Sequence, residues 1–416
     1  MESMVLEMRK MKDSGIEWIG EVPERWETQK LKYYATVTSG EILSKDEYVF
    51  SGDIPVIGSN GKIGTTYKSN NHSEVITTGR VGTIGTAQIV QDAWITDNAL
   101  IIKSHSISRP FLTYVIPNFD FKFMLSGTAQ PLITATKLKN QYIPVPSSEV
   151  QDKLVQYLNT QIFNLSHLIS QVCSSIELYK KFKQAVITQA VTKGVRGERE
   201  MKDSGVDYIG QIPAEWVLGK LRNVGDTQNG ISKSSEFFGK GFPFVSYSDV
   251  YKNYSLPSTV SGLVDSTSEE QKRYSVKKGD IFFTRTSETI EEVGFSCVCE
   301  KDIPNATFAG FLIRVRPFSD KLYTTYAKYY FRSSHLRFYL VKEMNLVTRA
   351  SLGQSLLKSM PVLLPPLEEQ KEIADYLDTK CAEIDGLIAK KDQLAKELES
   401  YKKSLIYEVV TGKREV

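Results

Sequence analysis

Short polar loops flanked by glycine hold the side chains best suited to reading another molecule by hydrogen bonds. In the first half of the chain these candidates are Ser59, Asn60, Lys62, Thr78, Arg80, Thr128, Gln130, Thr134 and Lys137. In the second half they are Asn229, Ser232, Lys233, Ser246, Tyr247, Arg285, Thr286, Ser287, Thr348, Arg349, Ser351 and Gln354. Arginine can pair with guanine, Asn and Gln with adenine, and Ser, Thr and Lys with phosphate. Each residue alone could simply form a turn, so only the sets indicate DNA binding.

Catalytic motifs are missing from the chain. There is no G-x-x-x-x-G-K-[ST] phosphate loop, and the two G-x-x-G-x-x-G runs lack the G-x-G spacing of a dinucleotide site. Asp265, Glu270 and Lys272 resemble a nuclease set only faintly and lie in a polar stretch that reads as a solvated loop. No Asn-Pro-Pro-aromatic tetrapeptide of an adenine methyltransferase is present. We therefore predict a non-catalytic chain with no metal site and no cofactor of its own.

The composition is that of a globular protein rather than a membrane protein. The chain has 416 residues, of which 41% are hydrophobic and 24% charged, with a net charge of +3. This length predicts two or three domains, and no run of about 20 apolar residues suggests a membrane span. Four cysteines without metal-binding spacing favour a reducing cytoplasm.

Two long helices organise the sequence. Residues 366–411 predict a helix of about 44 residues, or about 65 Å at ~1.5 Å per residue. Residues 151–192 repeat its pattern 219 positions earlier, so the two helices can cover each other. Apolar residues recur at heptad spacing in both, and we call them the seam residues: Leu154, Leu158, Ile162, Leu165, Ile169, Ile176, Ile373, Leu377, Ile384, Ile388, Leu398 and Leu405. Lys391 and Lys402 interrupt the pattern.

A second repeat opens each half of the chain. Residues 11–20 (MKDSGIEWIG) return as residues 201–210 (MKDSGVDYIG), and Trp26 returns as Trp216, an offset of 190. The chain is thus a tandem duplication with divergent middles. Strands are expected at 54–57, 74–77, 86–90, 99–102, 242–245, 280–284, 295–299 and 311–315, with helices near 110–119 and 322–341.

We predict an α+β fold: two β-rich globular domains joined by two long antiparallel coiled-coil helices in a pseudo-twofold repeat. The predicted parts are an extension (1–10), a first domain (11–148), a first helix (149–192), a linker (193–200), a second domain (201–366), a second helix (367–412) and a tail (413–416).

This arrangement resembles the specificity subunit of type I restriction–modification enzymes over residues 11–416. The residues that carry the resemblance are 11–20 with Pro23 and Trp26, their copy at 201–216, and 365–374 (PPLEEQKEIA) at the start of the second helix. The first helix departs from this pattern, because it begins with PSSEVQ. Ser148 and Gln151 predict a capping box there instead.

The resemblance implies that each domain is a target recognition domain for one half of a bipartite double-stranded DNA sequence. The helices would be a spacer that docks two methyltransferase (M) subunits, joined by two restriction/translocase (R) subunits. S-adenosylmethionine, ATP and Mg²⁺ would belong to those partners, which carry out DNA methylation or cutting in host defence. Two alternatives stay open: a standalone DNA-binding or regulatory protein, and a coiled-coil adaptor without DNA binding.

Overall fold

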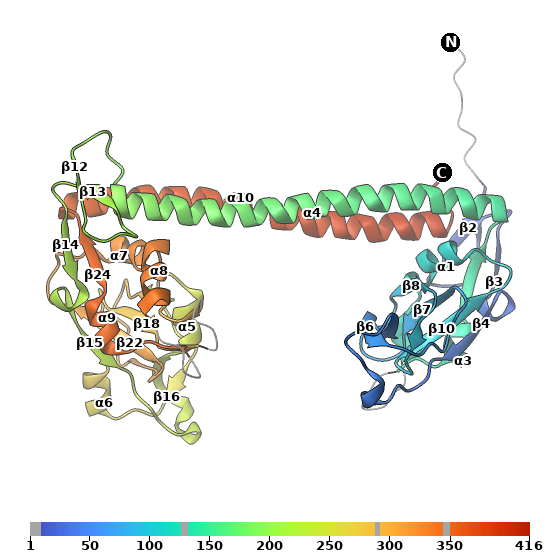
Figure 1. Ribbon diagram of the computed structural model, residues 1–416, viewed down its shortest axis with the longest axis horizontal. Coiled ribbons are helices and arrows are strands. Elements are labelled where there is room, and N and C mark those ends of the chain that lie inside the picture. Colours follow the sequence, from blue (N-terminus) through green and yellow to red (C-terminus); the bar gives the residue numbers. More distant parts are fainter. Residues whose placement is uncertain (1–9, 126–131, 288–291, 344–349) are drawn as a thin grey trace, which may run out of the picture. The chain divides into compact units, whose positions relative to one another are not determined.

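The computed structural model describes residues 10–125, 132–287, 292–343 and 350–416. The chain divides into two compact units: unit 1 holds Met1–Cys173 and Gln393–Val416, and unit 2 holds Ser174–Asp392. Each unit contains a β-rich globular part and a portion of both long helices, α4 (Ser148–Lys193) and α10 (Leu367–Val410) (Figure 1). The predicted α+β class, with two β-rich domains and two long packed helices, is confirmed.

Unit 1 is built on a four-stranded antiparallel sheet in the order β4-β10-β7-β8, beside a three-stranded sheet in the order β6-β5-β9. Its strands are β1 (Met11–Asp13), β2 (Glu21–Pro23), β3 (Glu27–Lys30), β4 (Ala35–Ser39), β5 (Ile54–Gly58), β6 (Gly61–Thr66), β7 (Val75–Gly79), β8 (Ala87–Val90), β9 (Trp94–Ile95), β10 (Ala99–Ser104) and β11 (Tyr142–Val145). Its short helices are η1 (Leu31–Tyr33), η2 (Lys45–Glu47), α1 (Arg109–Val115), η3 (Ile116–Asn118), α2 (Phe121–Met124) and α3 (Ala135–Lys139).

The central sheet of unit 1 is buried on both faces, which explains its run of apolar residues. Successive side chains of a strand point to opposite faces. In β10, Leu100 and Ile102 belong to the cluster that includes Phe111 of α1, whereas Ile101 belongs to the cluster that includes Ile95 of β9. A strand covered on both faces needs no polar alternation.

Unit 2 repeats this plan with an antiparallel sheet in the order β15-β22-β18-β20. Its strands are β12 (Met201–Asp203), β13 (Gln211–Pro213), β14 (Val217–Lys220), β15 (Gly225–Asn229), β16 (Phe238–Val245), β17 (Leu263–Val264), β18 (Ile281–Thr284), β19 (Thr286–Ser287), β20 (Ser296–Val298), β21 (Thr307–Phe308), β22 (Leu312–Pro317), β23 (Ala350–Ser351) and β24 (Pro361–Leu364). Its short helices are η4 (Leu221–Asn223), η5 (Ser235–Phe237), α5 (Tyr247–Lys252), α6 (Ser268–Arg273), α7 (Thr324–Tyr330), α8 (Ser334–Glu343) and α9 (Gln354–Ser359).

The helix expected near 322–341 is two helices, α7 and α8, so that prediction was wrong in detail. The chain turns between them, where Ser333 Oγ donates to Tyr330 O (2.5 Å). The guanidinium of Arg332 at this turn donates to the backbone carbonyls of Ser296, Val250, Tyr251 and Asn253. The break therefore ties α7 and α8 to the strands and to the end of α5.

The two long helices pack against each other in both units. In unit 1 the first part of α4 lies beside the last part of α10, where Lys402 Nζ donates to Ser166 Oγ (2.9 Å). In unit 2 the last part of α4 lies beside the first part of α10, where Lys391 Nζ lies 5.6 Å from the centre of the Tyr179 ring. The helices are therefore antiparallel, and the lysines that interrupt the heptads contact the opposite helix. None of the predicted seam residues is exposed; Val172, which the prediction skipped, is also buried.

A buried glutamine fixes the start of α4. Gln151 Nε2 donates to Pro146 O (2.8 Å), and Gln151 Oε1 accepts a hydrogen bond from Ser108 N (2.8 Å). The capping box predicted for Ser148 and Gln151 was therefore wrong, because the glutamine side chain bonds the loop before α1 instead.

Gln370 does the same at the start of α10. Its Nε2 donates to Pro365 O (2.9 Å) and to Lys321 O (2.8 Å), and its Oε1 accepts from Tyr323 N (2.8 Å). Gln370 is the counterpart of Gln151 in the repeat, so the identity of these two residues has a structural cause. In each unit the amide joins a long helix to the loop that precedes a helix of the globular part.

Candidate nucleic-acid interface

Two loops of unit 1 lie against each other. One is the β5–β6 turn, which contains Ser59, and the other connects β7 to β8. Thr86 Oγ1 donates to Ser59 O (3.2 Å). A Cβ on Gly79 would lie 1.8 Å from Thr83 O and 2.7 Å from Ser59 O, so only glycine allows this approach.

A third segment, which leads into α3, joins the β7–β8 loop. Ile133 N donates to Arg80 O (2.9 Å), and Val81 forms an antiparallel bridge with Leu132. The fold thus gathers predicted residues that are far apart in the sequence. Thr78 is not among them at the surface, because its side chain is buried in β7 (3% exposed).

Some of the predicted side chains in this cluster of unit 1 form hydrogen bonds within the fold, whereas others are exposed. Thr134 caps α3 by accepting from Lys137 N (3.2 Å), and Lys137 Nζ donates to Met124 O (2.9 Å). Asn60 and Lys62, in contrast, are exposed at the β5–β6 turn. These two residues are therefore better placed to meet a ligand than Thr134 or Lys137.

Unit 2 builds a corresponding cluster. Leu352 N donates to Arg285 O (2.7 Å), and Thr286 pairs with Ser351 where β19 meets β23. This joins the loop after β18 to the segment before α9, as in unit 1.

A side-chain network continues this cluster toward β15. Gln354 Nε2 donates to Asn229 Oδ1 (2.9 Å), and Thr227 Oγ1 donates to Gln354 Oε1 (2.7 Å). Asn229 and Gln354 were both predicted from the sequence as site residues, and the fold places them in contact.

Other predicted residues of unit 2 are engaged within the fold. Lys233 Nζ lies 2.7 Å from a carboxylate oxygen of Glu270 and has only 14% of its side chain exposed. Burial raises the pKa of Glu270, but the hydrogen bonds from Lys233 and from backbone outweigh it, so this pKa lies below its ordinary value. Ser246 caps α5 in a capping box with Asp249. We expect Lys233 and Ser246 to serve structure first.

The other predicted site residues are exposed, packed against a neighbour, or outside the described residues. Ser232 is exposed, and the Tyr247 ring stacks on Tyr251 at 5.9 Å. Four predicted residues lie outside the described residues: Thr128, Gln130, Thr348 and Arg349. The side chain of Ser287 also lies outside them.

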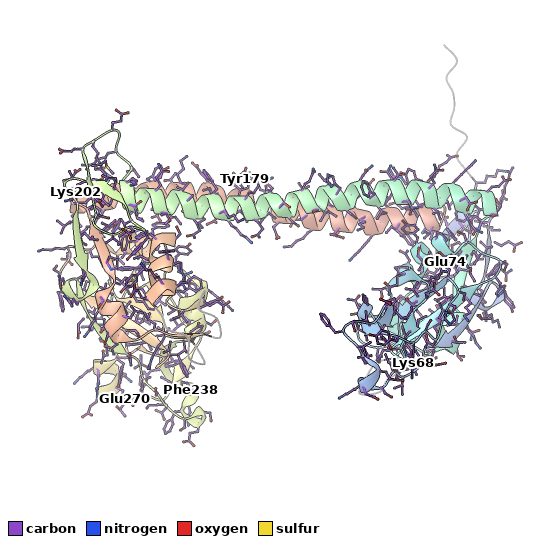
Figure 2. The ribbon with its side chains drawn as sticks, viewed as in Figure 1. Lys68, Glu74, Tyr179, Lys202, Phe238 and Glu270 are labelled. Atoms are coloured by element: carbon purple, nitrogen blue, oxygen red, sulfur yellow. The ribbon has the colours of Figure 1, made fainter. Side chains whose placement is uncertain are left out.

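Several exposed side chains near these loops were missed by sequence reasoning. Phe311 (62% exposed) and Asn98 accept backbone hydrogen bonds from Arg285 N and Arg80 N respectively, both at 2.9 Å. Phe238 (39% exposed) lies at the end of unit 2 away from the long helices (Figure 2). The signal available in the sequence was its FFGKGF run, in which aromatic residues lie among glycines and a lysine.

Within the described residues, no group of three or more His, Cys, Asp or Glu side chains could hold a metal ion. Among the described helices, none is both long and apolar enough to cross a membrane. The four cysteines are free thiols, and burial raises the pKa of Cys297 and of Cys299 to about 12.

The family to which the chain belongs follows from comparison with known proteins. The model of the type I restriction modification DNA specificity domain matches residues 23–178 and again residues 213–397. The chain belongs to this family. The two matches cover both globular parts and much of both long helices, so the duplication read from the sequence is a repeat of this domain.

Two curated relatives come from Methanocaldococcus jannaschii. The MjaVIII specificity subunit of a type I restriction enzyme is 26% identical over 324 residues, which are 77% of this chain and 71% of that protein. The putative MjaX specificity subunit is 24% identical over 444 residues, with 95% of each chain covered.

Solved structures share the fold. One chain from a study of complex assembly and conformational transition of the type I R-M system superposes with a TM-score of 0.71 at 17% identity, covering 94% of this chain and 99% of that one. The HsdS subunit of Thermoanaerobacter tengcongensis gives a TM-score of 0.50 at 18% identity, covering 94% and 98%.

The protein is therefore a DNA specificity subunit of a type I restriction–modification system, a non-catalytic part of that complex. This decides between the readings that the sequence left open. A standalone regulator and a coiled-coil adaptor without DNA binding are both set aside.

Proposed function

We propose that the globular part of each unit reads one half of a bipartite target in double-stranded DNA. One observation carries this proposal. The loop clusters lie at equivalent strands of the two sheets, β7 and β18, and are held by the same pattern of main-chain hydrogen bonds, but they present different side chains. A common scaffold with different side chains suits the reading of two different short sequences, because base edges are told apart by the groups that meet them.

The long helices, in this proposal, fix the distance between the two half-sites and dock two methyltransferase (M) subunits. Large apolar side chains outside the seam support docking. Phe163 (73% exposed), Leu178 (65%) and Phe182 (54%) lie on α4, and Leu394 (43%) and Tyr401 (47%) lie on α10. Exposed apolar surface of this kind is typical of protein interfaces.

The chemistry belongs to the partners. The M subunits would bind S-adenosylmethionine and methylate adenine in each half-site, and two restriction/translocase (R) subunits would use ATP and Mg²⁺ to translocate and cut unmodified DNA. The specificity subunit would work in the cytoplasm, where it meets both invading and host DNA. Its role is to place each methyltransferase active site over its half-site.

Co-expression with the cognate M subunit, followed by genome-wide mapping of methylated adenines, tests this proposal. We expect a two-part motif with a gap of fixed length, and none when the specificity subunit is left out. Inserting one heptad into both long helices should lengthen the gap and leave the bases of each half unchanged. The absence of any new methylation, or a motif without a gap, would contradict the proposal.

A further inference from the structure

An arginine stands at the same place in both units. Arg80 directly follows β7 and Arg285 directly follows β18, and these strands are each third in the orders β4-β10-β7-β8 and β15-β22-β18-β20. The residues around the two arginines differ: Thr-Gly precedes and Val-Gly follows the first, whereas Phe-Thr precedes and Thr-Ser follows the second.

The backbone of each arginine is held from both sides by equivalent hydrogen bonds. Arg80 N donates to Asn98 O, one residue before β10, and Arg285 N donates to Phe311 O, one residue before β22. On the other side, Arg80 O and Arg285 O each accept a bond from the segment that leads into α3 or α9. Each arginine side chain therefore starts from a fixed point in the loop cluster.

The fold itself makes little use of these guanidinium groups. Arg80 Nη1 has one long contact with Asp97 O (3.4 Å), and Arg80 Nε is buried without a hydrogen-bond partner. Of the carboxylates in the part of the chain that the structure describes, none forms an ion pair with Arg80 or Arg285. A purely structural reason for keeping arginine at both positions is thus lacking among the described residues.

The exposed residue across the main-chain bond differs in chemistry. It is Asn98 in unit 1 and Phe311 in unit 2. An amide can bond a base edge, and an aromatic ring can contact a thymine methyl group. At this place both units therefore have an arginine, and the exposed residue beside it differs between them.

We infer that Arg80 and Arg285 bind DNA phosphates in the same way in the two half-sites, while Asn98 and Phe311 contact bases. This inference rests on the proposed function. A side chain that is the same in two readers of different sequences cannot distinguish them, whereas phosphates are alike in every sequence. Arginine also pairs well with phosphate through its two-pronged guanidinium.

Salt dependence separates the two roles. The full chain is assembled with its M subunits, and binding to target and to scrambled duplexes is measured over a salt series. Arg80→Ala and Arg285→Ala should each weaken binding to both duplexes by about tenfold, and each should reduce the slope of log affinity against log salt by about one. Arg80→Lys and Arg285→Lys keep the charge, so the slope of log affinity against log salt should stay near the parent value. If the alanine variants fold poorly, these lysine variants still test the inference.

Matched variants give the opposite pattern. Asn98→Ala and Phe311→Ala should relax the methylated motif in one half only, without changing the salt slope. Arg109→Ala removes the same charge from a surface ion pair with Glu74, and it should leave both readouts unchanged.

Two results would overturn the inference: an altered methylation motif for either arginine variant, or an unchanged salt slope for both alanine variants. Failure of the parent complex to bind its target would instead contradict the proposed function.

Discussion

The two units begin their long helices in the same way but secure them differently. Gln151 and Gln370 make equivalent bonds to the backbone around the first turn. One residue earlier, however, unit 1 has Val150, which packs against the apolar core, and unit 2 has Glu369, which is fully buried.

The buried Glu369 sits in an ionic joint. Arg199 Nη2 lies 2.6 Å from one carboxylate oxygen, and Trp216 Nε1 donates to the other at 3.0 Å. The counterpart of that tryptophan in unit 1 is Trp26, against which the backbone of Gly412 packs closely. The residue before the glutamine is therefore held by apolar packing in unit 1 and by a buried ion pair in unit 2. Removing one partner of the ion pair would leave the other partner without its compensating charge.

Removing the Glu369 carboxylate should destabilise unit 2 far more than the matched change at Val150 destabilises unit 1. Glu369→Ala leaves Arg199 without its buried partner, and we expect it to lower the free energy of unfolding by about 3–5 kcal/mol. Val150→Ala should cost only about 1 kcal/mol, because it removes two methyl groups from a half-buried site. Urea titration, followed by hydrogen exchange in each unit separately, measures both.

A double variant sharpens this comparison. Replacing Glu369 with Val and Arg199 with Met together should recover part of the loss, since an apolar pair can substitute for the buried ion pair, although the buried Nε1 of Trp216 still lacks its acceptor. Equal losses for Glu369→Ala and Val150→Ala would show that the ionic joint has no special weight.

The glutamines should give the next largest effect. Gln151→Ala and Gln370→Ala each leave a buried carbonyl, Pro146 O or Pro365 O, and further partly buried backbone groups unpaired, which should lower the free energy of unfolding by roughly 2–3 kcal/mol. Gln370 makes three such bonds and Gln151 two, so unit 2 should again lose more. Faster amide exchange at Tyr323 and at Ser108 would report each loss locally; unchanged exchange at both amides would mean that the bonds are not formed in solution.

Acidification should give the smallest difference in stability between the two units. Burial lowers the pKa of His335 in unit 2 from 6.5 to about 4, whereas the three histidines of unit 1 are exposed. Between those values the unfolded chain binds a proton that the folded chain does not, so stability falls as the pH drops from 6.5 toward 4. At pH 5 this effect lowers the free energy of unfolding by about 2 kcal/mol relative to neutral pH.

The check is the slope of unfolding free energy against pH in parent and His335→Asn proteins. The variant should lose that part of the slope, whatever its absolute stability. Identical slopes would show that His335 titrates normally in the folded chain.

The long helices were the most predictable part of the fold because their information is local and repeated. Helix α4 spans Ser148–Lys193 where the sequence predicted 149–192, and heptad spacing alone selected residues that are not exposed. The central strands were predictable too, because apolar runs bounded by glycine leave few alternatives. The break between α7 and α8 was not, since it depends on Arg332 reaching carbonyls about eighty residues earlier in the chain.

The candidate site was predictable only as a set of loops. Sequence reasoning selected Arg80 and Arg285 but could not show that they are equivalent, because their equivalence lies in main-chain bonds to Asn98 and Phe311. It also selected Lys233, whose ammonium group is paired with the carboxylate of Glu270, a residue 37 positions away. Which polar side chains remain available to a ligand depends on such distant partners, and composition and spacing do not report them.

Exchange of one recognition domain tests the central claim most directly. Residues 41–140 would be replaced by the corresponding segment of a relative with a different target, and methylated adenines mapped in cells that express the hybrid with its M subunit. We expect one half of the bipartite motif to change, while the other half and the gap stay the same. A change in both halves would contradict the assignment of one half-site to each unit.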